Sequence, residues 1–124
     1  MTKAVPPSRK QLGALGEKLA SKHLRKRGYH IWETNFRCRQ GEIDIIAQQK
    51  DCLVFIEVRT RTGAEFGTPE ESVTAAKKEK LISLALSYLQ THRNLPSSWR
   101  FDVVAVELDQ AGQVSRIELI QDAI

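Results

Sequence analysis

The sequence has 124 residues, of which 41% are hydrophobic and 27% are charged, and its formal net charge at pH 7 is +4. This length and composition are typical of one soluble globular domain that is large enough to bury its own core. No apolar run approaches the roughly 20 residues that a membrane helix needs, which excludes a membrane-spanning protein.

The charge is distributed unevenly along the chain. Residues 1–40 contain ten Lys or Arg and two acidic residues, giving +8, whereas residues 41–124 contain nine basic and thirteen acidic residues, giving −4. A basic segment of this kind is either a solvated face or a contact surface for a polyanion. We take binding to a polyanion such as nucleic acid as the leading functional interpretation.

The chain is expected to begin with a flexible arm over residues 1–8, which contains Pro6 and Pro7, and to continue as a single domain over residues 9–124. The start, MTKAVPPSRK, has no hydrophobic block behind its basic residues and therefore does not resemble a secretory signal. Two isolated cysteines without metal-ligand spacing, Cys38 and Cys52, are expected to be reduced thiols. We therefore expect a cytoplasmic protein.

The first predicted element of the domain is a helix over residues 9–27, with Ser8 as its N-cap and Gly28 at its end. Glu17 lies on the shoulder of the apolar stripe of this helix. The residues three and four positions away from Glu17 are Gly13, Ala14, Ala20 and Ser21, and none of them can form an ion pair with it. An acid without a helical partner is a candidate for a functional site.

The remaining pattern predicts five strands and a second helix. The elements follow the order α-β-β-β-α-β-β, and the expected strands cover residues 29–37, 42–48, 52–60, 100–108 and 114–120. The second helix is expected over residues 69–91, after a loop with the sequence TGAEFGTPEE. The fold class is therefore predicted to be α/β, with a sheet of about five strands that is flanked by helices.

Asp44 and Glu57 stand in the middle of two otherwise apolar strands. If Lys50 and Asp51 form a two-residue turn between these strands, Asp44 faces Glu57, because the paired positions sum to 101. In the same register Glu42 faces Arg59, and alternation places these side chains and Arg61 on one side of the hairpin.

Two carboxylates that face each other repel, so something must compensate their charge. The two acids can share a proton, Arg59 or Arg61 can tie them into an ion network, or a divalent cation can lie between them. Mg²⁺ takes oxygen ligands and typically uses one or two carboxylates. Glu17 would be an additional ligand, direct or through water, if the first helix packs beside the hairpin.

This arrangement resembles the PD-(D/E)xK nuclease superfamily, with Glu17, Asp44 and the triplet Glu57-Val58-Arg59 at the positions of its motif. A narrower resemblance, to the YraN-like bacterial family, covers about residues 12–108 and rests on the motifs LGEKLA, NFRCRQGEIDIIA, LVFIEVRTR, FGTPEESV and RFDVVAVE. The superfamily implies a restriction-endonuclease-like fold with a mixed sheet, akin to archaeal Holliday junction resolvases. It also implies that Asp44 and Glu57 bind Mg²⁺ or Mn²⁺, aided by the main-chain carbonyl of Val58.

The chain departs from the superfamily pattern at two positions, with Ile43 in place of proline and Arg59 in place of lysine. Arg59 can stabilise negative charge on a phosphate, but it stays protonated and cannot act as a general base. Lys77 of the second predicted helix is the first candidate to replace the missing lysine, and Lys80 is the second; both can equally belong to a solvated helix face.

The expected function is therefore Mg²⁺-dependent hydrolysis of DNA phosphodiesters, selective for the structure of the DNA rather than for its sequence. The catalytic residues would be Glu17, Asp44, Glu57, Arg59 and Lys77. The expected contacts with backbone phosphates are Lys22, Arg25, Lys26, Arg37, Arg39 and Arg61.

Two alternatives remain open from the sequence. One is a nucleic-acid-binding module that keeps the nuclease fold without catalysis, and the other is a subunit whose basic part docks an acidic protein. The superfamily often works as dimers and junction cleavage needs two active sites, so a homodimer is one arrangement that the resemblance implies.

Overall fold

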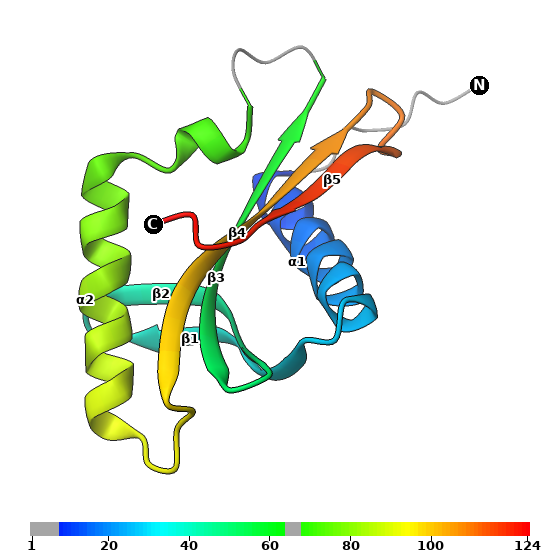
Figure 1. Ribbon diagram of the computed structural model, residues 1–124. Helices are drawn as coiled ribbons and strands as arrows, with labels where there is room; N and C mark the ends of the chain where they lie inside the picture. Colours follow the sequence, from blue (N-terminus) through cyan, green and yellow to red (C-terminus); the bar gives the residue numbers. More distant parts are fainter. Residues whose placement is uncertain (1–7, 64–67) are drawn as a thin grey trace.

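A computed structural model describes residues 8–63 and 68–124 of the chain. The elements are α1 (Arg9–Lys26), β1 (His30–Cys38), β2 (Gly41–Gln49), β3 (Cys52–Thr62), the 3₁₀ turn η1 (Glu70–Ser72), α2 (Ala75–Thr91), β4 (Ser98–Leu108) and β5 (Val114–Ile120). The α/β class and the order α-β-β-β-α-β-β are confirmed (Figure 1). Apart from Ser8, the predicted N-terminal arm lies outside the described residues.

The five strands form one mixed sheet in the order β1-β2-β3-β4-β5. Strands β3 and β4 are parallel, and the other neighbouring pairs are antiparallel. Strands β2 and β3 pair from Gln49 and Cys52 to Ile45 and Ile56 around the turn at Lys50. The predicted register, in which paired positions sum to 101, is therefore confirmed along this ladder.

The two helices cover opposite faces of the sheet (Figure 1). On one face, Ala20 and Leu24 of α1 belong to a buried cluster with strand residues such as Val54, Ile56 and Val104. On the other face, α2 contributes to a second buried cluster that contains Leu81, Leu84, Ala85, Tyr88, Phe55 and Phe101. Because the central strands are buried on both faces, their sequences are nearly continuous apolar runs.

The start of α1 agrees with the prediction. Ser8 and Gln11 form a capping box, in which the Gln11 N–H donates to Ser8 Oγ at 3.2 Å and the Ser8 N–H donates to Gln11 Oε1 at 2.8 Å. Gly28 follows the helix with φ +83°, a left-handed conformation that favours glycine. The hydrogen bonds of the Ser8 cap therefore define where α1, the helix that carries Glu17, begins.

The prediction that the second helix begins at residue 69 is wrong. Residues Glu70–Ser72 form the separate turn η1, and α2 begins only at Ala75. The Thr74 hydroxyl oxygen accepts the Lys77 N–H at 3.3 Å, so threonine acts as the N-cap that the sequence pattern concealed. Within residues 8–63 and 68–124, neither helix combines the length and the hydropathy needed to cross a membrane.

Candidate metal and nucleic-acid site

Strands β2 and β3 separate beyond the pair Ile45 and Ile56, and we call the opening between them the β2–β3 fork. The beginning of β2 lies beside α2, whereas β3 continues along β4 (Figure 1). At the fork, the Val58 N–H donates to Asp44 Oδ2 at 2.8 Å. The Val58 carbonyl points to the same side of β3, because N–H and C=O of one strand residue point the same way.

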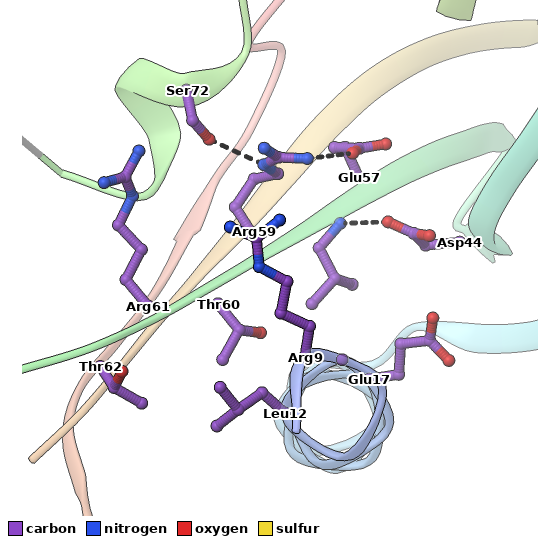
Figure 2. A pocket seen from close by; sticks show the side chains of 12 residues that line it. Arg9, Leu12, Glu17, Asp44, Glu57, Arg59, Thr60, Arg61, Thr62 and Ser72 are labelled. Carbon is purple, nitrogen blue, oxygen red and sulfur yellow. Dashed lines mark hydrogen bonds and ion pairs between the residues drawn. The ribbon is translucent and has the colours of Figure 1, made fainter. Parts of the chain in front are cut away.

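The fork opens into a cavity of about 480 Å³ between α1, β3 and η1, which we call the arginine pocket. Arg9, Arg59 and Arg61 line one side of it, and Glu17, Asp44 and Glu57 line the other (Figure 2). The structure therefore brings the three predicted acids and the predicted Arg59 and Arg61 to one cavity. Apart from the ion pair between Arg59 and Glu57, the positive and the negative side chains lie on different sides of the cavity, an arrangement that can hold a metal ion beside a phosphate.

Carboxylate oxygens of Glu17, Glu42 and Asp44 lie within 4.8 Å of one another, and we call this group the acid cluster. All three residues are half-buried. A set of carboxylate oxygens suits a hard cation such as Mg²⁺. Glu42 does not face Arg59 as predicted, because it pairs across β1 and β2 with Arg37, whose Nε lies 3.4 Å from Glu42 Oε2.

Glu57 does not belong to the acid cluster, because Arg59 engages its carboxylate. Arg59 Nη1 lies 3.3 Å from Glu57 Oε1, and Arg59 Nε donates to Ser72 Oγ at 2.7 Å (Figure 2). One of the compensations open from the sequence, an ion network through Arg59, is thus present for Glu57. This network does not include Asp44, which has no contact with a cationic side chain in the part of the chain that the structure describes.

The pKa values of two carboxylates of the site, Asp44 and Glu57, are raised. Burial and the nearby charge of Glu57, with smaller contributions from Glu17 and Glu42, raise the pKa of Asp44 to about 7, although the Val58 N–H opposes this rise. Burial also raises the pKa of Glu57, while Arg59 and Lys77 act in the opposite direction. A divalent cation at the acid cluster would offset the repulsion that, together with burial, raises the pKa of Asp44.

Gly16 sets the distance between α1 and β3. A Cβ atom at this position would lie 1.9 Å from Thr60 Oγ1 and 3.1 Å from Thr60 Cβ, so only glycine permits the observed approach. Because Glu17 follows Gly16, the close packing of the helix on β3 carries the Glu17 carboxylate to the acid cluster. From the sequence, Glu17 could join the acids only if the first helix packed beside the hairpin. The structure shows that Gly16 permits this packing.

The predicted phosphate contacts are divided among three places. Lys22, Arg25 and Lys26 are exposed on the second half of α1, whereas Arg37 and Arg39 are exposed near the β1–β2 turn. Of the six predicted residues, only Arg61 lines the arginine pocket.

Arg9 and Ser72 were not predicted from the sequence as site residues, and Glu42 was not predicted as a ligand. Two spacings carried a signal. Glu42 precedes Asp44 by two residues and therefore shares its side of the strand. Arg9 precedes Glu17 by eight residues, about two helical turns. Ser72 carried no local signal, because its role depends on how η1 folds back over Arg59.

Comparison with known proteins places this chain in a sequence family. The model of the uncharacterised protein family UPF0102 matches residues 16–106. A UPF0102 protein of Pelotomaculum thermopropionicum is 45% identical over 94% of this chain and 97% of its own length. Those of Moorella thermoacetica and Syntrophus aciditrophicus are 47% and 48% identical, over 94% and 90% of this chain and 97% and 86% of their own lengths. The predicted YraN-like resemblance is thereby confirmed.

Proposed function

The chain belongs to the uncharacterised protein family UPF0102, and from the geometry of its site we propose that it is a metal-dependent hydrolase of nucleic-acid phosphodiesters. The observation that carries this proposal is the arginine pocket, in which Glu17 and Asp44 stand opposite Arg9 and Arg61 across one cavity. A phosphodiester that reacts next to a divalent cation needs carboxylates for the cation and cationic side chains for the phosphate.

The acid cluster would hold Mg²⁺ or Mn²⁺ through the carboxylates of Glu17, Glu42 and Asp44. Glu57 and the Val58 carbonyl, which the resemblance implies as ligands, border the same fork. A bound divalent cation supplies charge that polarises a phosphate and lowers the pKa of water. The fit rests on a donor set made of oxygens alone, which three carboxylates bring within 4.8 Å of one another.

Arg59 is the residue of the chain that would stabilise the charge on the reacting phosphate. Its guanidinium is held on both sides, by Ser72 Oγ at Nε and by Glu57 at Nη1, so it presents donors in a fixed direction. Because arginine stays protonated, Arg59 cannot take a proton from water. Lys77, whose charge lowers the pKa of Glu57, is the proposed replacement for the ammonium group that the superfamily has at the position of Arg59.

The substrate we propose is DNA recognised by shape, because the basic side chains lie on α1, at the β1–β2 turn and in the arginine pocket, where they can contact phosphates without reading bases. The proposed compartment is the cytoplasm, where the free thiols of Cys38 and Cys52 would stay reduced. A homodimer remains part of the proposal, and sedimentation in the presence of branched DNA tests it.

Cleavage of end-labelled DNA junctions, flaps and linear duplexes with Mg²⁺ tests the proposed activity. Asp44→Asn should lower the rate of cleavage at least about 100-fold, a loss of about 2.7 kcal/mol of transition-state stabilisation. Glu79→Gln removes one charge on the exposed surface of α2 and should leave the rate within about twofold. Equal rates for the wild type and Asp44→Asn would refute the proposal.

The ion pair between Arg59 and Glu57 favours a second candidate, a nucleic-acid-binding module without catalysis, because it occupies one of the carboxylates expected to bind metal. Calorimetric titration of Mn²⁺ separates the two functions. The hydrolase requires binding that Asp44→Asn abolishes. The module requires salt-sensitive DNA binding that EDTA leaves unchanged.

A further inference from the structure

A second cavity, of about 210 Å³, lies on the other side of Glu57, and we call it the lysine pocket. It is lined by Glu42, Glu57, Lys77, Lys80, Leu81 and Leu84. Glu57 lines both this cavity and the arginine pocket. The acidic site therefore has two neighbouring cavities, one with guanidinium groups and one with ammonium groups.

Both lysines are exposed on α2, and both line this cavity together with Glu57. The charge of Lys77 acts on Glu57 and lowers its pKa. Lys80 lies against Gly41, because a Cβ atom at Gly41 would be 3.0 Å from Lys80 Cε and 3.6 Å from Nζ. Gly41 has φ +148°, which favours glycine, and its missing side chain leaves room for the lysine. Among the described residues, neither ammonium group forms a hydrogen bond or an ion pair.

The wall of the lysine pocket is apolar at Leu81 and Leu84, which are 6% and 1% exposed. An apolar surface suits the face of a sugar or a base, and ammonium groups suit a phosphate. Both chemistries together are those of one nucleotide. A cavity of about 210 Å³ is too small for a base pair, and its size suits part of one nucleotide.

We propose that the lysine pocket is a second nucleic-acid subsite, which holds the unpaired nucleotide next to the scissile phosphate. The strand passes from the arginine pocket across Glu57 into the lysine pocket, with Lys80 on a flanking phosphate. This inference rests on the proposed hydrolase, and it adds a path for the strand. Because this path continues on both sides of Glu57, the phosphodiester that is cut can lie inside an unpaired strand rather than at its end.

Binding of fluorescent single-stranded DNA at several salt concentrations, with Ca²⁺ in place of Mg²⁺, tests the phosphate contact without turnover. For single strands the slope of log K against log salt changes by about 0.7 for each phosphate neutralised. Lys80→Ala should therefore reduce the slope by about 0.7, and Lys80→Arg should preserve it. An unchanged slope for Lys80→Ala overturns the subsite.

Lys78→Ala is the matched control, because Lys78 lies on the same helix but lines a different cavity, with Glu70, Val73, Val103, Ile120 and Ala123. It carries the same charge change, and its slope should equal that of the wild type. If Lys78→Ala lowers the slope as much as Lys80→Ala does, the lysines act only through net charge, and the subsite is also overturned.

The continuous path is tested with circular DNA, which has no ends. Circular single-stranded DNA should be cut with Mg²⁺ at a rate within about tenfold of linear single strands, and a relaxed double-stranded circle of the same sequence should be cut more slowly. Cutting of linear strands alone, or equal cutting of both circles, contradicts a path for an unpaired internal segment.

These experiments separate the subsite from the proposed function. If no DNA is cut under any condition while Lys80→Ala still lowers the salt slope, the hydrolase fails and the subsite stands as a binding site. If DNA is cut and Asp44→Asn abolishes cutting while Lys80→Ala binds like the wild type, the subsite fails and the hydrolase stands.

Discussion

Asp44 and Asp102 are aspartates of the same sheet. Among the described residues, a cationic side chain compensates the charge of Asp102 but not that of Asp44. Asp102 on β4 is fully buried, and its carboxylate accepts hydrogen bonds from Tyr29 Oη at 2.7 Å, Arg100 Nε at 3.0 Å and the Asp122 N–H at 2.9 Å. The guanidinium of Arg100 also neutralises its charge. Its surroundings therefore meet every need of a buried carboxylate.

Asp44 has the reverse surroundings. Among the described residues it accepts one hydrogen bond, from the Val58 N–H, and the negative charges that raise its pKa are those of Glu57, Glu17 and Glu42. Burial of a carboxylate is thus common to both sites and says nothing about function by itself. The sign of the neighbouring charges is what distinguishes a structural aspartate from a candidate metal ligand.

The largest expected effect tests the structural half of this comparison. Asp102→Ala leaves Arg100 and Tyr29 without their shared partner, and it should lower the free energy of unfolding by about 3–5 kcal/mol. Urea denaturation measures this loss. Asp44→Ala should cost far less without metal, because it removes repulsion together with its hydrogen bond. Equal losses in the two variants would show that the two aspartates do not differ.

The next effect concerns pH. Because the pKa of Asp44 is raised to about 7 in the folded protein, its contribution to stability is present at low pH and is lost as the pH rises through 7. Without metal, the wild type should therefore lose about 2 kcal/mol relative to Asp44→Asn between pH 5 and pH 8. Thermal unfolding of both proteins at each pH measures this difference.

His23 is the reason for comparing the two proteins rather than following the wild type alone. Burial lowers the pKa of His23, so its contribution to stability grows over the same pH range, with the opposite sign. Both proteins contain His23, and its effect cancels in the difference. A difference that stays constant from pH 5 to pH 8 would mean that Asp44 titrates normally, and the contrast with Asp102 would weaken.

A smaller effect tests the packing that completes the acid cluster. Gly16→Ala places a methyl group against Thr60, and it should lower the free energy of unfolding by about 1–2 kcal/mol as α1 moves from β3. Thr60→Ala in the same chain should restore most of the loss. Calorimetry measures the Mn²⁺ affinity of both variants. If the added Thr60→Ala restores stability but leaves the affinity as low as in Gly16→Ala alone, Gly16 acts on the site by a route other than this packing.

The smallest effect concerns Glu17 itself. Glu17→Gln keeps the shape of the side chain but removes one of the charges of the acid cluster, and Mn²⁺ affinity should fall about tenfold, or about 1.4 kcal/mol. Stability without metal should not fall, because repulsion with Asp44 is relieved. Unchanged affinity would exclude Glu17 as a ligand and leave a cluster of two carboxylates.

Local patterns predicted most of the fold. The Ser8 cap, the strand alternation and the short turn at Lys50 fixed the element order and the register of β2 with β3. The second helix was the exception, because Pro69 and the apolar Val73 suggested an earlier start than the Thr74 cap allows. These signals act over a few residues, so sequence reasoning can follow them.

The candidate site was only partly accessible to such reasoning. The motif spacing indicated Glu17, Asp44 and Glu57 as acids of one site, but it did not reveal that Arg59 engages Glu57 or that Glu42 joins the cluster. The contacts of Arg59 depend on η1, whose place is set by Glu70 and its ion pair with Arg116 of β5.

The sequence by itself therefore determined the order of the helices and strands, the hairpin register and the presence of acids where a core residue would be expected. Tertiary structure alone decided which acids share a counterion and which do not. The reason is physical: hydrogen bonds of caps, turns and ladders join residues that are near in sequence or paired in register. The charge that each carboxylate experiences is set by side chains from α1, η1 and α2, and their approach depends on how the whole sheet is packed.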